Sequence, residues 1–297
     1  MKSRLVILML VLLSVTSGVY LASAQQSDDE VRGAFLSSRP KTTNANAPGG
    51  RRRRPTRPTN TSPAVKNVNS APVNQSVVVN VNTGRRPSSA IALGYTIFMR
   101  DVNGRAVRVD PAREFVNGDR IRISLEPNVD GYVYVFHTEN DGPPQMIYPD
   151  ARLEGGDNWI EAHVPVEIPS SLETDERLRW FQFFGNPGVE RLYVVVTRES
   201  LADVPFGEAL VNFCTANKDK CPWRPPVTAW AQLQQASKAD VRIVTSKASG
   251  QVQTEKEQVA MTRGLGLDQT APQPSVIRMS ASTNAPVLVT ILDLVHK

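Results

Sequence analysis

The sequence predicts a mainly β fold, a β-sandwich of roughly nine short strands with an inserted segment of short helices and loop. The first observation is that apolar and polar residues alternate over residues 118–125 and 131–136, which is typical of half-buried strands. The second is that turn-forming dipeptides such as Asn103-Gly104 and Asn117-Gly118 separate the alternating runs. We therefore expect residues 118–125 and 131–136 to form two strands that meet in one sheet.

Residues 91–297 are expected to form this sandwich as a single domain. Further short apolar runs bounded by Gly, Pro or Asp predict strands at residues 145–148, 158–164, 178–184, 192–197 and 287–297. Residues 206–283 look like an insert, because helical spacing appears at 206–213 and around Trp230, whereas residues 246–284 are mostly polar and predict loop. The insert is too polar for a core of its own, so we expect it to fold onto the sandwich.

The N-terminus has the pattern of a secretory signal peptide over residues 1–24. Lys2 and Arg4 precede an apolar run, and Ala22-Ser23-Ala24 is typical of a cleavage site. The apolar run is shorter than the roughly 20 residues of a membrane-spanning helix. We expect cleavage after Ala24, a periplasmic or secreted protein, and no transmembrane segment after cleavage.

The positive charge of the chain is confined to its first part. Residues 1–90 hold 13 Lys and Arg against 3 Asp and Glu, whereas residues 91–297 hold 21 against 26. A nucleic-acid-binding protein normally carries its positive charge on the folded domain that reads the nucleic acid. We therefore expect no nucleic-acid partner.

Residues 25–90 have the Pro, Asn, Thr and Arg content of a disordered basic linker. A small apolar group at residues 29–36 would either stay disordered or dock on a partner or on the chain's own domain, and residues 77–81 could add an edge strand. Clustered guanidinium groups attract anionic polymers, although a solvated spacer has the same composition. The candidate anion-binding residues are Arg51, Arg52, Arg53, Arg54 and Arg57.

Cys214 and Cys221, with six residues between them, are the only cysteines. In an oxidising compartment a close pair favours a disulfide over a metal clamp, because zinc would need two more ligands nearby. A calcium loop starting at His137 fails, since a carboxylate is needed at both ends of the template. We expect no metal and no cofactor.

Catalytic residues are not indicated by any motif. His137 is followed by Glu139 and Asp141, but no Gly-x-Ser-x-Gly elbow accompanies them, and a surface histidine at the end of a strand is the ordinary interpretation. The same interpretation applies to His163. We expect a protein that is not an enzyme.

One short run, residues 180–184, carries aromatic side chains on both faces of a strand. One face would fill the core, and the other would meet the inserted helices, a partner protein or stacked sugar rings. The candidate interaction surface is Trp180, Phe181, Phe183 and Phe184.

Five motifs follow one another in a recognisable order: Gly118-Asp119 before a strand, residues 131–135, Tyr148-Pro149, Ile168-Pro169 and residues 188–197. Over residues 93–205, with 287–297 as a closing strand, the chain resembles the domain of unknown function 4384 family. The resemblance implies an exported bacterial protein with an accessory or interaction role, and it brings no catalytic residues. We expect a non-catalytic interaction module of the cell envelope. The alternatives are a binder of anionic envelope polymers through the arginine-rich arm and a hydrolase of unrecognised type.

Overall fold

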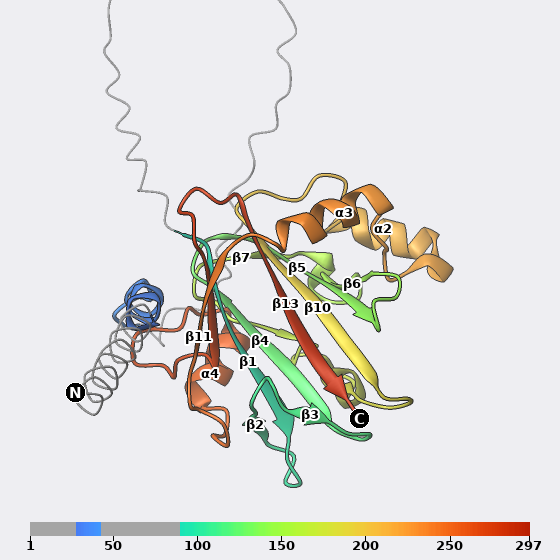
Figure 1. Cartoon of the computed structure of the whole chain (residues 1–297). Coiled ribbons are helices and arrows are strands. Elements are labelled where there is room, and N and C mark those ends of the chain that lie inside the picture. The colour runs from blue at the N-terminus through green and yellow to red at the C-terminus, as the bar shows by residue number, and fades with distance from the viewer. Residues whose placement is uncertain (1–27, 43–89) are drawn as a thin grey trace, which may run out of the picture.

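The computed structural model describes residues 28–42 and 90–297. Residues 90–297 form two sheets that pack face to face, with helices on their outer sides (Figure 1). The predicted mainly β sandwich is therefore confirmed, although it has 13 strands rather than roughly nine. No helix among the described residues has the length and apolar content to cross a membrane.

The first sheet is antiparallel and has the order β11-β12-β1-β4-β8, with β2 added to β1 and β9 added to β4. Its central pair is β1 with β4, which are in register from Leu93 opposite Pro127 to Met99 opposite Ile121. Its strands are β1 (Ala92–Arg100), β2 (Ala106–Arg108), β4 (Arg120–Pro127), β8 (Val166–Ile168), β9 (Phe181–Gln182), β11 (Val241–Thr245) and β12 (Val276–Ser280).

The second sheet has the order β3-β13-β10-β5-β6, with β7 added to β5. The last strand of the chain lies inside this sheet, between β3 and β10, as its β-branched sequence predicts. Only β3 runs parallel to its neighbour. The strands are β3 (Glu114–Phe115), β5 (Gly131–Glu139), β6 (Gln145–Tyr148), β7 (Trp159–Ile160), β10 (Gly188–Thr197) and β13 (Val287–His296).

The prediction that residues 118–125 and 131–136 meet in one sheet is wrong. They form β4 and β5, which belong to opposite sheets, and the turn between them carries the chain across the sandwich. β4 pairs with β1, and β5 pairs with β10 from Tyr132 to Glu139. Alternation shows which face of a strand is buried but does not show which strand lies beside it.

The main core lies between the two sheets. Side chains at alternate positions of β4 and β5 point inward and are buried there, among them Ile121, Ile123, Val133 and Val135. The inward face of β13 contributes Leu292 to the same cluster. Burial of such aliphatic side chains contributes about 1.5–3 kcal/mol each.

The helices α2 (Glu208–Ala216) and α3 (Val227–Ala236) cover the outer face of the second sheet, as the spacing of the insert predicts. The outer face of β5 and β10 is aromatic, and the Trp230 ring of α3 lies 4.6 Å from Tyr193 and 6.0 Å from Phe136. Three short 3-10 turns accompany these elements, η1 (Glu154–Gly156), η2 (Glu176–Arg179) and η3 (Lys218–Lys220).

The prediction of loop for residues 246–284 is wrong, because these residues include α4 (Glu255–Arg263) and β12. Thr254 and Glu257 form a capping box at the start of α4, and Gly264 ends the helix with φ 61°. The helix packs on the first sheet through charged groups rather than through an apolar stripe, so apolar spacing could not reveal it. The predicted strand at 178–184 is likewise divided between η2 and β9.

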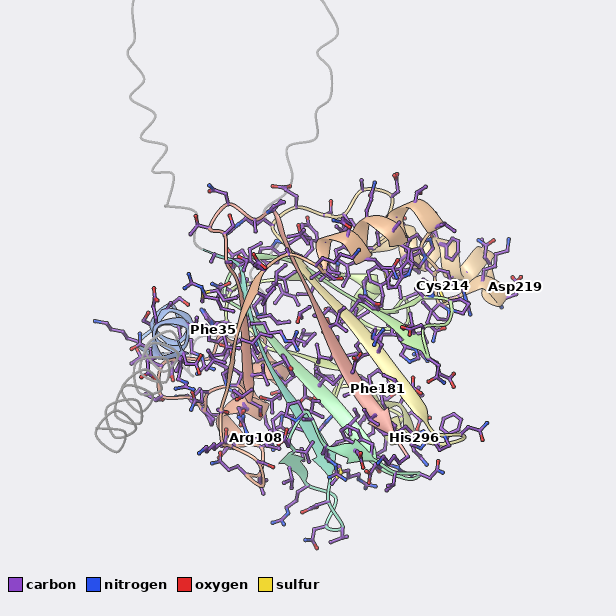
Figure 2. The ribbon with its side chains drawn as sticks, in the orientation of Figure 1. Phe35, Arg108, Phe181, Cys214, Asp219 and His296 are labelled. Carbon is purple, nitrogen blue, oxygen red and sulfur yellow. A yellow bond between two sulfur atoms is a disulfide. The ribbon has the colours of Figure 1, made fainter. Side chains whose placement is uncertain are left out.

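Residues 28–42 do not belong to a linker, although the prediction placed them in one. Residues 28–37 are helical and pack against the first sheet, where Phe35 is fully buried (Figure 2). The apolar group at 29–36 is therefore docked on the chain's own domain. The signal peptide, the arginine cluster at 51–57 and the candidate strand at 77–81 lie outside the described residues.

Candidate binding sites

The outer face of the first sheet carries a layer of buried charges. Arg108, Arg122 and Glu126 are at most 8% exposed. Residues from α4 and from residues 28–42 cover Arg108 and Glu126, and Trp180 and Glu167 cover Arg122. Arg108 is paired with Glu257 of α4, and the Arg122 guanidinium lies 3.4 Å from Glu167 and 4.1 Å from the centre of the Trp180 ring. Burial lowers the pKa of both arginines, and the paired carboxylates oppose that shift.

Arg39 fills the centre of a site that we call the helix socket. The site is formed by Gly94, Glu126, His163, Asp268, Ala271, Pro272 and Pro274. Arg39 donates from its Nε and Nη2 to the two carboxylate oxygens of Glu126 at 2.8 and 2.7 Å. Its Nη1 donates to the carbonyl of Ala271 at 3.0 Å, and its Nη2 donates to the carbonyl of Pro272 at 3.1 Å. The planar guanidinium therefore has a matching acceptor on each side.

The remaining wall of the helix socket is apolar and closely fitted. The rings of Phe35 and His163 pack in an edge-to-face arrangement, at 5.3 Å between ring centres. A Cβ at Gly94 would lie 2.8 Å from Phe35 Cζ and 2.6 Å from Pro274 Cγ, so this position has no room for a side chain.

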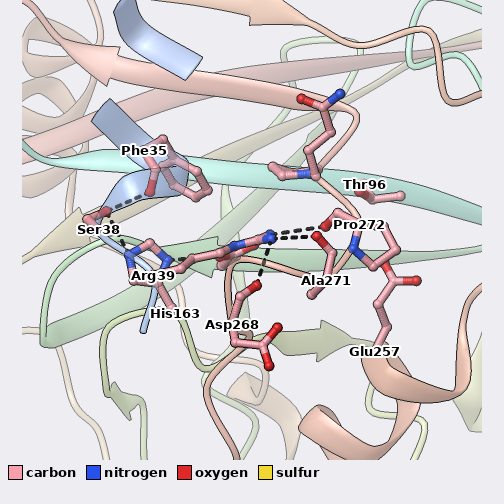
Figure 3. Close-up of polar contacts among 12 residues, drawn as sticks. Phe35, Ser38, Arg39, Thr96, His163, Glu257, Asp268, Ala271 and Pro272 are labelled. Atoms are coloured by element: carbon pink, nitrogen blue, oxygen red, sulfur yellow. Dashed lines mark hydrogen bonds and ion pairs between the residues drawn. The ribbon is translucent and has the colours of Figure 1, made fainter. Parts of the chain in front are cut away.

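His163 is not the surface histidine in a strand that the sequence predicts. It is 2% exposed, it lies in a turn with φ 61°, and its Nδ1 lies 2.8 Å from Glu126 Oε1. Its Nε2 lies 2.8 Å from Ser38 Oγ (Figure 3). The histidine thus joins the helical segment to Glu126.

A serine, a histidine and a glutamate in this order have the connectivity of a hydrolase triad. Two contacts indicate that these three side chains instead hold the N-terminal helical segment on the domain. Ser38 Oγ is within 2.6 Å of the Phe35 carbonyl, and both oxygens of Glu126 are bound by Arg39. The hollow beside Glu126 has a volume of about 10 Å³, which is too small for a substrate.

The second site is an open groove of about 1100 Å³ along one side of the sandwich. β8 is an edge strand of the first sheet, β6 is an edge strand of the second, and both strands line the groove. We call it the aromatic groove, because five rings line it: Tyr148, Trp159, Trp180, Phe181 and Trp223. Such a concave site with apolar walls has the form of a ligand or peptide site.

Carboxylates dominate the charged lining of the aromatic groove. Six acidic residues and two arginines contribute to its wall, and one of these arginines, Arg152, is bound by Asp150. That hydrogen bond raises the pKa of Arg152. The acidic residues are Asp150, Glu154, Asp157, Glu161, Glu167 and Glu173.

The structure divides the predicted aromatic surface into different roles. Trp180 and Phe181 line the aromatic groove, whereas Phe183 stacks on Phe115 in the core at 4.6 Å. Phe184 is 80% exposed. The inserted helices do not cover these rings, because α2 and α3 lie on the second sheet.

The other histidine considered, His137, is half-buried on β5 and contacts Glu190 and Gln145. Asp141 is paired with Arg191, and Glu139 is exposed. Among residues 28–42 and 90–297, no three His, Cys, Asp or Glu side chains gather as metal ligands would.

Cys214 and Cys221 form the predicted disulfide, which connects the end of α2 to the segment before α3. Both cysteines line the aromatic groove. Replacing both by serine should lower the free energy of unfolding by about 2–3 kcal/mol, because the bond closes a short loop. Urea denaturation of the oxidised protein and of the double variant would measure this, and an unchanged midpoint would contradict it.

The fold defines a two-sheet β-sandwich domain with an open groove on one side. Residues 114–200 match the model of the family described as Domain of unknown function (DUF4384), so this part of the chain is similar to that family. The matched residues run from β3 past β10, so β1, β12 and β13 complete the sandwich from outside the match. No curated protein and no solved structure matches the chain.

Proposed function

We propose that the chain is an exported, non-catalytic interaction module of the cell envelope, and that the aromatic groove binds an extended, positively charged segment of a partner protein. The signal-peptide pattern of residues 1–24 supports export. The observation that supports the binding role is the groove itself. Aromatic rings and carboxylates line it together, between an edge strand of one sheet and an edge strand of the other.

The shape of the groove favours an extended segment. β8 is a short strand at the end of its sheet and lines the groove, so a bound segment can add to it as a further strand. Trp159 and Phe181 are only half-buried and supply flat apolar surface beside it. Aromatic side chains of this kind commonly contribute most of the binding energy at an interface.

The charge of the groove favours a cationic partner. Glu161 and Glu173 are half-buried on its wall, and the excess of carboxylates attracts Lys and Arg side chains. The arginine-rich arm offers the opposite specificity, because it would bind anionic polymers. These two modes of binding respond differently to substitutions and can be separated.

The test uses the full mature chain and two labelled peptides of equal length, one of alternating Lys and Val and one of alternating Glu and Val, both of which can pair as a strand. We expect the cationic peptide to bind more tightly, and Trp159→Ala to weaken its binding about tenfold. Glu161→Lys should also weaken binding, most strongly at low salt. The control Glu139→Lys changes an exposed carboxylate outside the groove lining and should leave binding unchanged.

Equal binding of the two peptides, or binding that Trp159→Ala does not change, would overturn the groove proposal. Retention on an anionic polymer that is lost on replacing Arg51, Arg52, Arg53 and Arg54 by serine, but kept in Trp159→Ala, would assign the binding role to the arm instead. Fluorescence anisotropy measures the peptides, and co-sedimentation measures the polymer.

A further inference from the structure

The N-terminal segment, residues 28–42, contacts the domain as a bound peptide would. Its three buried side chains, Val31, Phe35 and Arg39, follow one another at intervals of four and are at most 2% exposed. Val31 and Phe35 lie one turn apart on the same face of the helix, and Arg39 follows in the turn after the helix ends at residue 37. Most of the residues between them are exposed, including Gly33, Ala34 and Ser37.

The domain supplies every other part of the helix socket. Glu126 comes from β4, His163 from the turn after β7, and the carbonyl acceptors for Arg39 from the loop after α4. The N-terminal segment adds no strand to either sheet. Removal of the segment would leave the strand pairings of both sheets in place.

In the sequence, residues 43–89 separate the N-terminal segment from the first strand of the domain. The segment therefore contacts the helix socket non-covalently, and its only covalent connection to the domain runs through residues 43–89. Because the segment and the helix socket belong to one chain, their association is intramolecular, and the attached segment competes with any free peptide for the helix socket. The segment can therefore dissociate from the helix socket while the sandwich stays folded, provided that all of its contacts break together.

We propose that the helix socket is a binding site for a short helix with an aliphatic and an aromatic residue one turn apart, followed four residues after the aromatic one by an arginine in the turn that ends the helix. The N-terminal segment is its tethered ligand and exchanges with a free helix of the same pattern. Specificity for arginine comes from Glu126 and from the carbonyls of Ala271 and Pro272, which match a planar guanidinium. Specificity for the aromatic ring comes from the bare backbone at Gly94.

The experiment places a cleavage site for a sequence-specific protease between residues 60 and 70 of the full mature chain. After cleavage, the N-terminal fragment should remain bound at high protein concentration and dissociate on dilution. A labelled peptide of residues 28–42 should then bind the emptied domain on the order of a hundredfold more tightly than it binds the uncut chain. Circular dichroism should show that the strands persist throughout.

Two substitutions in the labelled peptide form a matched pair. Arg39→Ala should abolish binding, because it removes the group that satisfies buried Glu126. Arg32→Ala should weaken binding little, because the Arg32 side chain is 30% exposed and its interactions are with an exposed carboxylate and one carbonyl. Within the domain, Gly94→Ala should lower affinity for the peptide, while Trp159→Ala in the aromatic groove should not.

The proposal is overturned if the cut fragment never leaves on dilution, if the sheets unfold when it leaves, or if the Arg39→Ala peptide binds as well as the native one. The first two results would make residues 28–42 an integral part of the fold. None of these results depends on the aromatic groove, so the two proposals can fail separately.

Discussion

Replacing Arg108 by alanine is expected to lower the free energy of unfolding by about 3–5 kcal/mol. The Arg108 side chain is 1% exposed and is paired with Glu257, whose side chain is 9% exposed. Its Nη1 also donates to Thr96 Oγ1 at 3.2 Å and to the Gln273 carbonyl at 3.0 Å. The substitution would leave a buried carboxylate without its cation, which costs more than the loss of the attraction itself.

The same hairpin offers a matched control for this measurement. Arg105 is paired with Asp101, but its side chain is 57% exposed, and an exposed pair contributes about 0–1 kcal/mol. Urea denaturation should therefore show a large loss for Arg108→Ala and a small one for Arg105→Ala. Equal losses would mean that solvent reaches the charged layer.

A double variant distinguishes the cost of an unpaired buried charge from the loss of packing by the Arg108 side chain. Arg108→Met combined with Glu257→Gln removes both charges and keeps an acceptor for the Thr254 backbone at the start of α4. We expect it to be clearly more stable than Arg108→Ala alone, because no unpaired buried charge remains. If the double variant lost as much stability as Arg108→Ala, the packing of the arginine stem rather than charge compensation would explain the effect.

The charged layer also shows where sequence patterns stop being informative. The alternation in residues 120–126 predicts one buried face and one polar face, and both faces exist as predicted. The polar face is nevertheless covered, because Arg39 pairs with Glu126 and Glu167 pairs with Arg122, both from distant parts of the chain. A polar residue paired with a distant partner looks in sequence like one that faces water.

The sequence pattern correctly predicts those elements whose structure depends on residues close together in the chain. The turn at Asn103-Gly104, the strand at 145–148 and the two helices of the insert follow from residues close together in the chain. The sheet partner of β5 and the existence of α4 did not follow, because tertiary contacts decide them.

The two candidate sites differ in how far the sequence could reveal them. Trp180 and Phe181 were recognised as interaction candidates, and both line the aromatic groove. Trp159 was missed because it belongs to a different strand, and the groove exists only where the ends of the two sheets meet. The role of Arg39 was missed because a single arginine after a short apolar group gives no signal of burial.

Replacing Phe136 by alanine is expected to lower the free energy of unfolding by about 3–5 kcal/mol, with its first effect on the helical layer. Phe136 is fully buried on the outer face of β5, 6.0 Å from the Trp230 ring of α3. The cavity would remove the surface on which α3 packs, while the core between the sheets keeps its side chains. Hydrogen exchange should therefore show loss of protection in α2 and α3 before β10 and β13.

Phe184→Ala is the matched control, because it removes the same side chain from a position that is 80% exposed. It should change the free energy of unfolding by no more than about 0.5 kcal/mol. Equal loss of protection in the helices and in both sheets of Phe136→Ala would show that the helical layer and the sandwich unfold as one cooperative unit. In that case α2 and α3 could not open separately, and the disulfide between Cys214 and Cys221 would stabilise the whole domain rather than its helical layer alone.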